Sequence, residues 1–491
     1  MTESNRLRMT WVDEVTPGVP PTTPRMRTVR LTGETLVFKP TFTTSEEIRS
    51  DRMNSDPIKT GETNSGPVNT EFSFPVDQTP HSSWLASAFC SPWANTPFRD
   101  NDGTPGAAIS GITASSGVIA VASGPAFVIG HLARLTGFGV AGNNGLFRII
   151  TGSATVPAVG ASTLTDEASP PASARVKVVG FQGAAGDVAA VSDGLTSTAL
   201  NFTTLGLAVG MWIKVGGTGG AFRFATEGCN GYARVIAISA NKLTLDNLPS
   251  APVWTADNGA GKTIRVFFGD QLRNGTTKRF GTIERGFMGQ ATPTYVKQSG
   301  MMVDQFQINL ESGAVVKATY TFKGLNGASD NTTLDSTPDA ATTNGVMSAA
   351  VHVGRISDGG SAVTGPNFNK SLQINLNNNA REVMAIRSDG KVGPVDINLG
   401  ECSVQVQANT YFGSGNTYAD YLAGIPTSAS SIIAKDGQAL VFAIPRMTRT
   451  DGSPNASGKN QDVMLPLTAQ ASFDPLVGAH ITLDRLEYVE A

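Results

Sequence analysis

The chain has 491 residues, of which 40% are hydrophobic and 16% charged, and its formal net charge at neutral pH is −3. This length exceeds what one core usually supports, so two or three domains are expected, and the hydrophobic content excludes global disorder. A nearly neutral chain offers no basic field for tight binding of nucleic acid. The 54 glycines and 27 prolines favour short strands and turns, which predicts an all-β protein with a few short helices.

The three cysteines, Cys90, Cys229 and Cys402, are far apart in the sequence and odd in number. This pattern is typical of free thiols in a protein assembled in a reducing cytoplasm. The first residues lack a basic region followed by an apolar core, and no apolar run approaches the ~20 residues that span a bilayer. We therefore expect neither a secretion signal nor a membrane anchor.

The first hundred residues are expected to contain an arm, two strands and two helices. Prolines in residues 1–25 favour an extended N-terminal arm, and residues 26–99 begin the first folded domain. Within that domain the patterns predict strands over 28–38 and 66–76, a short helix in the segment TTSEEIRSDRM (43–53), and a helix over 82–93 that ends at Pro92.

The composition changes between residues 100 and 261 to Gly, Ala, Ser, Val and Thr with few charges. Two passages in this region are similar: GHLARLTGF, NNGLFRI and STLTDE recur as GMWIKVGG, CNGYARV and KLTLDNL. We interpret the region as an insert of β-rich modules in tandem. The alternative is a chance similarity between strands that are interrupted by glycines.

Residues 262–325 continue the first domain and contain a predicted hairpin, VDQFQINLESGAVVKATYTFKG. Apolar and polar residues alternate in it, so one face is core and the other is uncharged and polar. Residues 326–345 are predicted to be a linker, and 346–491 a second, strand-rich half with a short helix over 418–422. Three competing alignments indicate a duplication: FQINLESG with LQINLNNN, the hairpin with GPVDINLGECSVQVQANTYFGSG, and GPVNTEFSF plus helix with GECSVQVQA plus helix.

The segment from Asp436 to Leu486 is the most informative part of the second half. Residues 439–444 are apolar on both strand faces, so this strand must be covered on both sides. Residues 463–473 alternate as a half-buried antiparallel strand does. Between them lies the polar tongue, Thr448 to Gln461, which we expect to be mobile in the isolated protein.

Catalytic and cofactor motifs are weak or missing in the sequence. DNGAGKT (257–263) has Ala256 where a phosphate-binding loop needs glycine, and no clean strand precedes it. The four histidines include no HExxH pair, and neither a GxSxG elbow nor a known cysteine-protease signature is present. We expect no enzymatic activity, no cofactor and no metal, although scattered carboxylates leave a polysaccharide-degrading β-protein open.

Several segments, in order, resemble the tail tube (major tail) proteins of long-tailed, non-contractile bacteriophages. They are VRLTGETLVF with TTSEEIRSDR, GPVNTEF, TKRFGTIERGF with VDQFQINL, SLQINLNNNAREV, and FAIPRMTRTDGSPNASGKNQDVMLPLTAQASFD. The resemblance covers nearly everything outside 100–261. It implies a duplicated tail-tube β-sandwich or half-barrel domain with an inserted β-rich decoration domain, whose copies join into rings that stack into a tube.

The resemblance also implies partners and surfaces, among them an adjacent subunit or the duplicated half as the second cover of the strand over 439–444. The expected assembly is a trimeric ring with pseudo-sixfold symmetry, or a hexamer, found in the virion and assembled in the host cytoplasm with tape-measure, tail-tip and terminator proteins. DNA passes through without tight binding. Candidate lumen-facing residues are Gln305, Gln307, Asn309, Gln373 and Asn375, which could instead form an ordinary solvated face. Candidate inter-ring contacts are Arg449, Asp451, Asn455, Lys459 and Asn460. The alternative function is a decoration or receptor-binding protein that acts through the insert.

Overall fold

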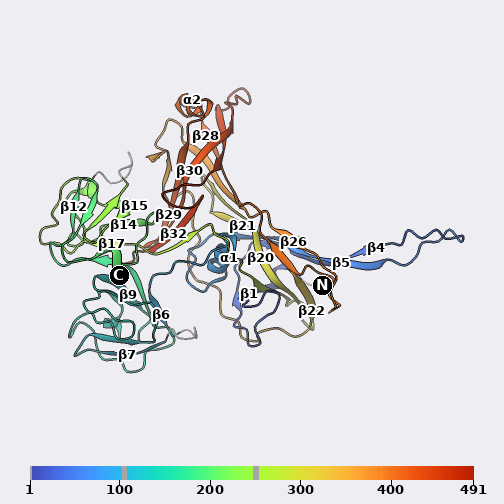
Figure 1. Cartoon of the computed structure of the whole chain (residues 1–491), viewed down its shortest axis with the longest axis horizontal. Helices are drawn as coiled ribbons and strands as arrows, with labels where there is room; N and C mark the ends of the chain where they lie inside the picture. The colour runs from blue at the N-terminus through green and yellow to red at the C-terminus, as the bar shows by residue number, and fades with distance from the viewer. Residues whose placement is uncertain (1–2, 102–107, 247–253, 389, 491) are drawn as a thin grey trace.

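The computed structural model describes residues 3–101, 108–246, 254–388 and 390–490, and nearly all of their regular structure is β (Figure 1). Two α-helices occur among these residues, α1 (Pro80–Ala88) and α2 (Asn416–Leu422). The predicted all-β class is confirmed. Outside the insert the strands are β1 (Leu7–Asp13), β2 (Arg27–Thr28), β3 (Gly33–Glu34), β4 (Val37–Thr43), β5 (Ile58–Glu71), β18 (Asp270–Arg273), β19 (Gly281–Phe287), β20 (Thr294–Glu311), β21 (Lys317–Lys323), β22 (Asn326–Asp330), β23 (Val353–Asp358), β24 (Ser361–Ala362), β25 (Asn369–Asn377), β26 (Arg381–Val383), β27 (Asp396–Asn398), β28 (Ser403–Tyr411), β29 (Thr427–Lys435), β30 (Gln438–Gly452), β31 (Met464–Ala471) and β32 (Thr482–Glu487).

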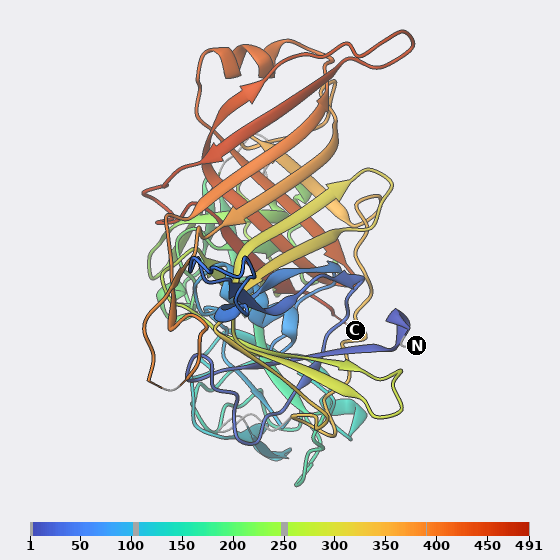
Figure 2. The ribbon, with the colours of Figure 1, turned by 90° about the vertical axis from the view of Figure 1, so that its right-hand side faces the viewer.

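Eight of these strands form one curved antiparallel layer, which we call the inner sheet. Its order is β4-β5-β21-β20-β25-β28-β31-β30. Figure 2 shows the yellow, orange and red strands of this layer side by side, with most of the insert behind them. Because β20 and β25 pair over seven residues, the first and second halves of the chain share one continuous sheet.

The two halves repeat the same strand order, which confirms the duplicated fold. The first half runs β4, β5, α1, β19, β20, β21, and the second runs β25, β28, α2, β29, β30, β31. The register irregularities coincide as well. The β19–β20 ladder shifts next to Met301 and the β29–β30 ladder next to Met447. The β20–β21 ladder shifts after Val303 and the β30–β31 ladder after Arg449. Bulges at matching places are features of a duplicated fold rather than of chance.

This register selects among the three sequence alignments. GPVNTEF plus α1 corresponds to the β28 segment plus α2, as one alignment proposed. The other two alignments are wrong. FQINLESG and LQINLNNN are not equivalent strands but neighbours, since Ile308 lies opposite Ile374 in the sheet. Paired strands that share one polar face and one apolar face acquire the same alternation, so they resemble each other without being copies.

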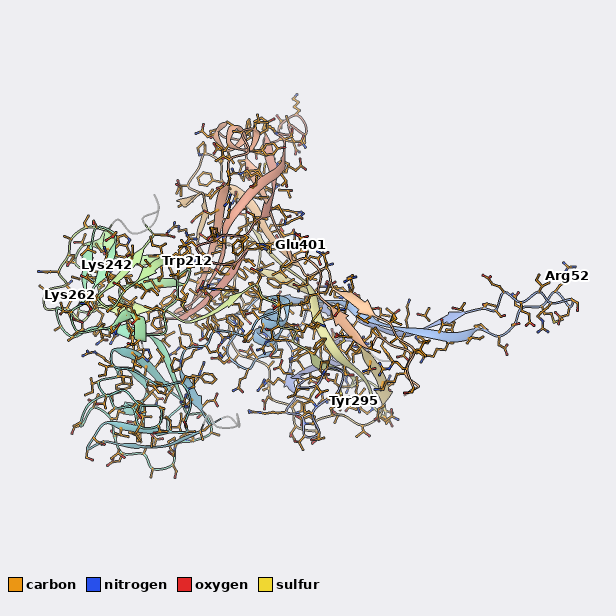
Figure 3. The ribbon with its side chains drawn as sticks, viewed as in Figure 1. Arg52, Trp212, Lys242, Lys262, Tyr295 and Glu401 are labelled. Atoms are coloured by element: carbon orange, nitrogen blue, oxygen red, sulfur yellow. The ribbon has the colours of Figure 1, made fainter. Side chains whose placement is uncertain are left out.

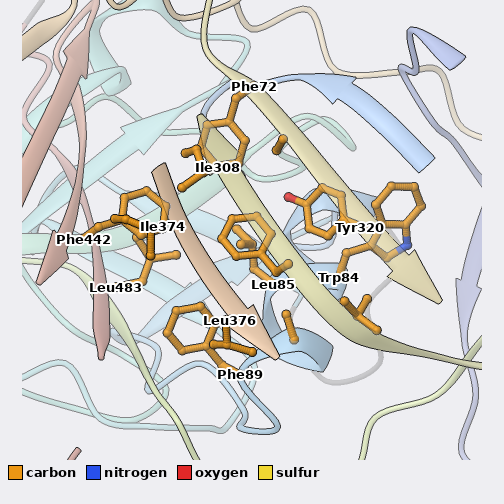
Figure 4. Packing of buried hydrophobic residues seen from close by; sticks show 14 of the residues in the cluster. Phe72, Trp84, Leu85, Phe89, Ile308, Tyr320, Ile374, Leu376, Phe442 and Leu483 are labelled. Carbon is orange, nitrogen blue, oxygen red and sulfur yellow. The ribbon is translucent and has the colours of Figure 1, made fainter. Parts of the chain in front are cut away.

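The main core lies behind the inner sheet and is closed by α1 (Figure 4). Pro80 opens this helix, where its missing N–H costs nothing. Trp84 is fully buried, and its ring centroid lies 5.1 Å from those of both Tyr320 and Phe322. By contrast, α2 buries none of its residues. The helix predicted over 82–93 is confirmed with shifted bounds, as is the helix predicted over 418–422.

The insert folds as a separate sheet with its own core (Figure 1). The order of its main sheet is β10-β9-β11-β17-β14-β15-β16-β13-β12, with β6 on β11. The sheet includes residues on both sides of the expected 100–261 limits, since β6 and β17 belong to it. The strands are β6 (Phe98–Asp100), β7 (Ile109–Thr113), β8 (Val118–Val121), β9 (His131–Thr136), β10 (Gly145–Arg148), β11 (Arg175–Gln182), β12 (Ala189–Val191), β13 (Gly194–Thr196), β14 (Trp212–Val215), β15 (Gly231–Ile238), β16 (Lys242–Leu245) and β17 (Arg265–Phe267).

The internal repeat predicted for the insert has a structural counterpart. In the β9–β10 ladder Leu135 faces Gly145, and in the β14–β15 ladder Val215 faces Gly231, the matching residue of the second passage. Asn144 also bonds both the N–H and the carbonyl of Phe138, as Asn230 does with Phe224. Equal hydrogen bonds at equal positions favour two related modules over chance similarity.

Three local expectations are wrong. Residues 44–53 form no helix but part of the loop at the end of the β4–β5 hairpin, because this projecting segment has no surface to pack on. Residues 7–13 are not an arm but strand β1, which pairs with β19 and buries Trp11 in the core. The segment 326–345 is not wholly a linker, since β22 pairs with β20. In each case tertiary contacts, or their absence, override local preference.

Candidate functional site

The structure brings the five candidate lumen residues together on one face of the inner sheet. Gln307 lies opposite Asn375, and Asn309 lies opposite Gln373. Gln305 is exposed on the same face, while Phe306 and Ile308, which alternate with these residues, are buried in the core. The alternation in the sequence is therefore that of a two-sided sheet with one core face and one polar face.

Neighbouring strands extend this polar face in both directions. It continues to Thr319 and Thr321 on β21 and to Gln405 on β28. These residues line a shallow hollow of about 350 Å³ together with four of the five predicted ones, Gln305, Gln307, Gln373 and Asn375. The amide of Gln373 donates to Oδ1 of Asn375 over 2.8 Å, and Thr319 Oγ1 lies 2.8 Å from Oδ1 of Asn69. Sequence reasoning missed Thr319, Thr321 and Gln405 because only the strand register assigns them to this face.

Charged residues lie towards the ends of these strands. Lys317 and Glu71 face each other on β21 and β5, and Lys323 Nζ pairs with Asp304 Oδ2 over 3.1 Å. The central band of the face, which we call the polar band, consists of Gln, Asn, Thr and Ser side chains. Such a band can form hydrogen bonds with water but offers no fixed cation to a passing phosphate.

The inner sheet has one open strand edge at each end. The outer edge of β4 has no paired strand among the described residues. At the other end, β29 covers β30 only as far as Met447, and beyond that residue no described strand pairs with this edge. Open edges with unpaired backbone groups are sites for pairing with another chain.

The five candidate inter-ring residues do not share one environment. Arg449 is buried, and its guanidinium pairs with Asp358 within the same chain, so it is not available as an external contact in this conformation. Asp451 lies near the exposed end of β30, and Asn455, Lys459 and Asn460 are exposed in the connection to β31. The predicted loop therefore begins after Gly452, since residues 448–452 are strand.

The insert is fixed to the rest of the chain by a buried ionic cluster. Lys177 on β11 bonds Asp77 Oδ2 over 2.7 Å and Asp270 Oδ2 over 2.6 Å. Arg485 Nε donates to Asp270 Oδ2 over 2.7 Å, and its Nη2 pairs with Asp77. Burial alone would raise the pKa of Asp77, but the charges of Lys177, Arg485 and Arg175 outweigh it and hold that pKa well below its usual range. The cluster thus links the insert to both halves.

Apolar contact supplements this ionic cluster. Val441 and Ala443, on the second apolar face of β30, pack with Ile432, Leu486 and Trp212. Figure 3 shows Trp212 between the insert and the red strands. The expectation that this strand is covered on both sides is confirmed, but the expected second cover, an adjacent subunit or the duplicated half, is wrong. The insert supplies it.

Asp484 lies next to this contact and forms no ion pair with a described residue, although the charge of Arg273 acts on it from nearby. Its Oδ1 accepts from Gln271 Nε2 over 2.9 Å and from the backbone N–H of Trp212 over 3.3 Å. Burial raises the pKa of Asp484 to about 8, despite these hydrogen bonds. The carboxyl is thereby kept largely neutral at pH 7, which suits a packing position between insert and sheet.

The described residues contain no group of three His, Cys, Asp or Glu side chains that could hold a metal ion. No helix among them is long and apolar enough to cross a membrane. The features that stand out are instead surfaces: a polar band and two open edges on a duplicated, curved sheet. Together they are the features of a structural protein whose main sheet has two strand edges without a partner among the described residues.

The comparison with protein families agrees with this class. The model of the family described as phage tail tube protein matches residues 4–228 and 242–471, and the chain belongs to this family. The match runs through most of the insert, further than the sequence resemblance did. No curated protein matches the chain. The chain is therefore a structural component of a phage tail.

Proposed function

We propose that this chain is the subunit of a tail tube that self-assembles into closed rings, and that the rings stack into a hollow conduit for DNA ejection. The observation that carries the proposal is the inner sheet, which combines a polar band with an open strand edge at each end. Closing such sheets on one another removes both edges and leaves the polar band facing a common channel. Residues 26–99 with 262–325, and 346–491, are the two tube halves.

The number of strands favours a trimeric ring. Each copy supplies eight strands to the inner sheet, so three copies supply 24. Strands about 4.8 Å apart and tilted by about 40° would close at a backbone diameter of roughly 48 Å. Six copies would give roughly twice that diameter. Because each copy carries two equivalent halves, three copies form a ring with pseudo-sixfold symmetry.

The polar band suits a channel through which DNA slides. Each phosphate held by a fixed cation adds to the cost of moving on, and the band contributes none in its centre. Gln305, Gln307, Asn309, Gln373 and Asn375 line the channel in this proposal. Tape-measure, tail-tip and terminator proteins are the expected partners during assembly in the host cytoplasm, and the subunit performs no chemical turnover.

The insert is proposed as an outward decoration, because it lies behind the inner sheet and has its own core. Because of the ionic cluster, simple removal of residues 100–261 would deprive Asp77 and Asp270 of their partner Lys177. We therefore expect removal of the insert to preserve tube formation only if these partners are replaced as well.

Electron microscopy of the expressed protein tests the proposal. The expected result, alone or with a tail-initiation complex, is hollow tubes whose cross-section shows threefold and pseudo-sixfold symmetry. Particles that remain monomeric under both conditions would contradict the function, and six complete chains per ring would contradict the trimer. A tube part that assembles normally while an isolated insert binds host cells would add a receptor-binding role.

A further inference from the structure

The two open edges of the inner sheet correspond to a junction that already exists inside the chain. In the first half, β20 leaves β19 at Met301 and then pairs with β25, beginning at Gln305. In the second half, β30 leaves β29 at Met447 and then has no described partner on that side. Because the halves are duplicated, the β20–β25 junction shows which strand the edge of β30 is built to receive. That strand is the equivalent of β25, namely β4.

The bulges fix which residue of β30 corresponds to Gln305. In the first half, Met301 of β20 adjoins the register shift with β19, and Val303 precedes the shift with β21. In the second half, Met447 of β30 adjoins the shift with β29, and Arg449 precedes the shift with β31. The residue that follows the second shift is Gln305 in β20 and Asp451 in β30. Asp451 is therefore the counterpart of Gln305.

The same argument fixes the residue of β4. Ser65 pairs with Lys323 on β21, and Gln405 pairs with Gln470 on β31, so Ser65 and Gln405 are counterparts. Ser65 faces Val37 on β4, and Gln405 faces Asn375 on β25. Two residues further along each strand, Lys39 is the counterpart of Asn377. Within the chain, Asn377 lies directly opposite Gln305.

We propose that β30 of one copy pairs with β4 of the next copy in this register, with Asp451 directly opposite Lys39 of that copy. This inference rests on the proposed function and names the contact that closes the ring. Both side chains are exposed, and neither has an ion-pair partner among the described residues. Where the internal junction places two neutral amides, the external junction places an acid opposite a base. Opposite charges directly across an antiparallel ladder stabilise it, and like charges oppose it.

The surroundings of the two strands are compatible with this pairing. Leu36, directly before β4, is buried and Lys39 on β4 is exposed, as Ile374 is buried and Asn377 half-buried on β25, so the faces alternate in phase. Pro40 follows Lys39 and cannot donate to a further ladder bond, so the ladder ends where the β20–β25 ladder ends. Helix α2 contacts β30 as its counterpart α1 contacts β20. Because β25 still pairs with β20 beside α1, α2 likewise leaves room for a strand beside β30.

The pairing also gives the start of the polar tongue a lateral partner. Residues 453–457 would continue along Gly33 to Val37 of the next copy, as residues 307–311 continue along β25. Asp451 and Asn455 then contribute to contacts within a ring. Lys459 and Asn460, further along the tongue, stay the candidates for contacts between rings.

A pair of cysteines at Lys39 and Asp451 tests the register. In a Cys402→Ser background, the Lys39→Cys, Asp451→Cys variant treated with a short bifunctional thiol reagent should yield covalently closed trimers. The matched control is Gln305→Cys with Asn377→Cys, which occupies the equivalent internal junction and should crosslink only within a chain. A second pair, Lys39→Cys with Lys459→Cys, should give at least tenfold less crosslinked product.

Charge reversal provides an independent readout. Asp451→Lys or Lys39→Asp alone should raise the critical concentration for assembly about threefold or more, and the two reversals together should restore it. Tubes that form normally while the Lys39–Asp451 cysteines stay uncrosslinked and the internal control crosslinks would overturn the register and leave the proposed function intact. A wild-type chain that forms neither rings nor tubes would overturn both.

Discussion

Replacing Asp270 by alanine is the sharpest test of how the insert is held. Asp270 is fully buried and accepts four hydrogen bonds, two from Thr96 (2.6 and 3.2 Å), one from Lys177 (2.6 Å) and one from Arg485 (2.7 Å). Its removal leaves two buried cations, Lys177 and Arg485, which share Asp77, while Glu487 Oε1 lies 3.5 Å from Lys177 Nζ. It also leaves the backbone N–H of Thr96 without its acceptor.

Breaking a buried ion pair by removing one partner typically costs about 3–5 kcal/mol. Because Asp77 still neutralises part of the charge, we expect Asp270→Ala to lower the stability of the interface between insert and tube part by about 3 kcal/mol. Asp270→Asn retains an acceptor for Thr96 and should cost less. The control is Asp193→Ala, which removes a half-exposed pair with Lys242 and should cost less than about 1 kcal/mol.

Native-state hydrogen exchange measures these effects locally. The backbone amides of β18 and β32, which pair through Asp270 and Arg485, report the opening free energy at the cluster. We expect faster exchange there in Asp270→Ala and unchanged exchange in Asp193→Ala. If the two variants differ by less than about 1 kcal/mol in the free energy of opening of these strands, the cluster does not hold the insert in place.

Three further perturbations probe the core, the pH response and the channel. Trp84→Ala should lower the free energy of unfolding by about 3–5 kcal/mol because it empties a site between Tyr320 and Phe322. Leu422→Ala on the exposed helix α2 should change that free energy by less than about 0.5 kcal/mol. Similar shifts of the melting temperature in both variants would contradict the packing. The raised pKa of Asp484 means that its favourable contribution is complete below about pH 4 and is lost as pH rises towards 8. In urea denaturation Asp484→Asn should therefore match wild type at pH 4 and exceed it at pH 8 by on the order of 5 kcal/mol, and a gain that does not depend on pH would argue against this titration. The double variant Gln307→Lys, Asn375→Lys adds cations to the polar band, so its tubes should stay intact but retain DNA at low salt and release it at high salt. Tubes of the control variant Glu46→Lys, changed on the projecting loop, should not retain DNA. Retention by neither variant would place the band outside the channel.

Local patterns in the sequence are enough to show which residues alternate along a strand and which strand is apolar on both faces. Because the side-chain period of a strand is two, the spacing of Gln305, Gln307 and Asn309 was enough to predict a sheet with one core face and one polar face. The double apolar pattern of residues 439–444 likewise required two covers. These properties are local, and the structure reproduces them.

Only the tertiary structure decided what those faces meet. Trp212 covers Val441 and Ala443 although it lies more than 200 residues away in the chain, and no local pattern indicates such a contact. The strand register likewise showed that LQINLNNN is the neighbour of FQINLESG rather than its copy. It also showed that the bulges of β20 and β30 coincide. Strand order and pairing depend on contacts between distant segments, so the two open edges at which the ring is proposed to close became visible only in the folded chain.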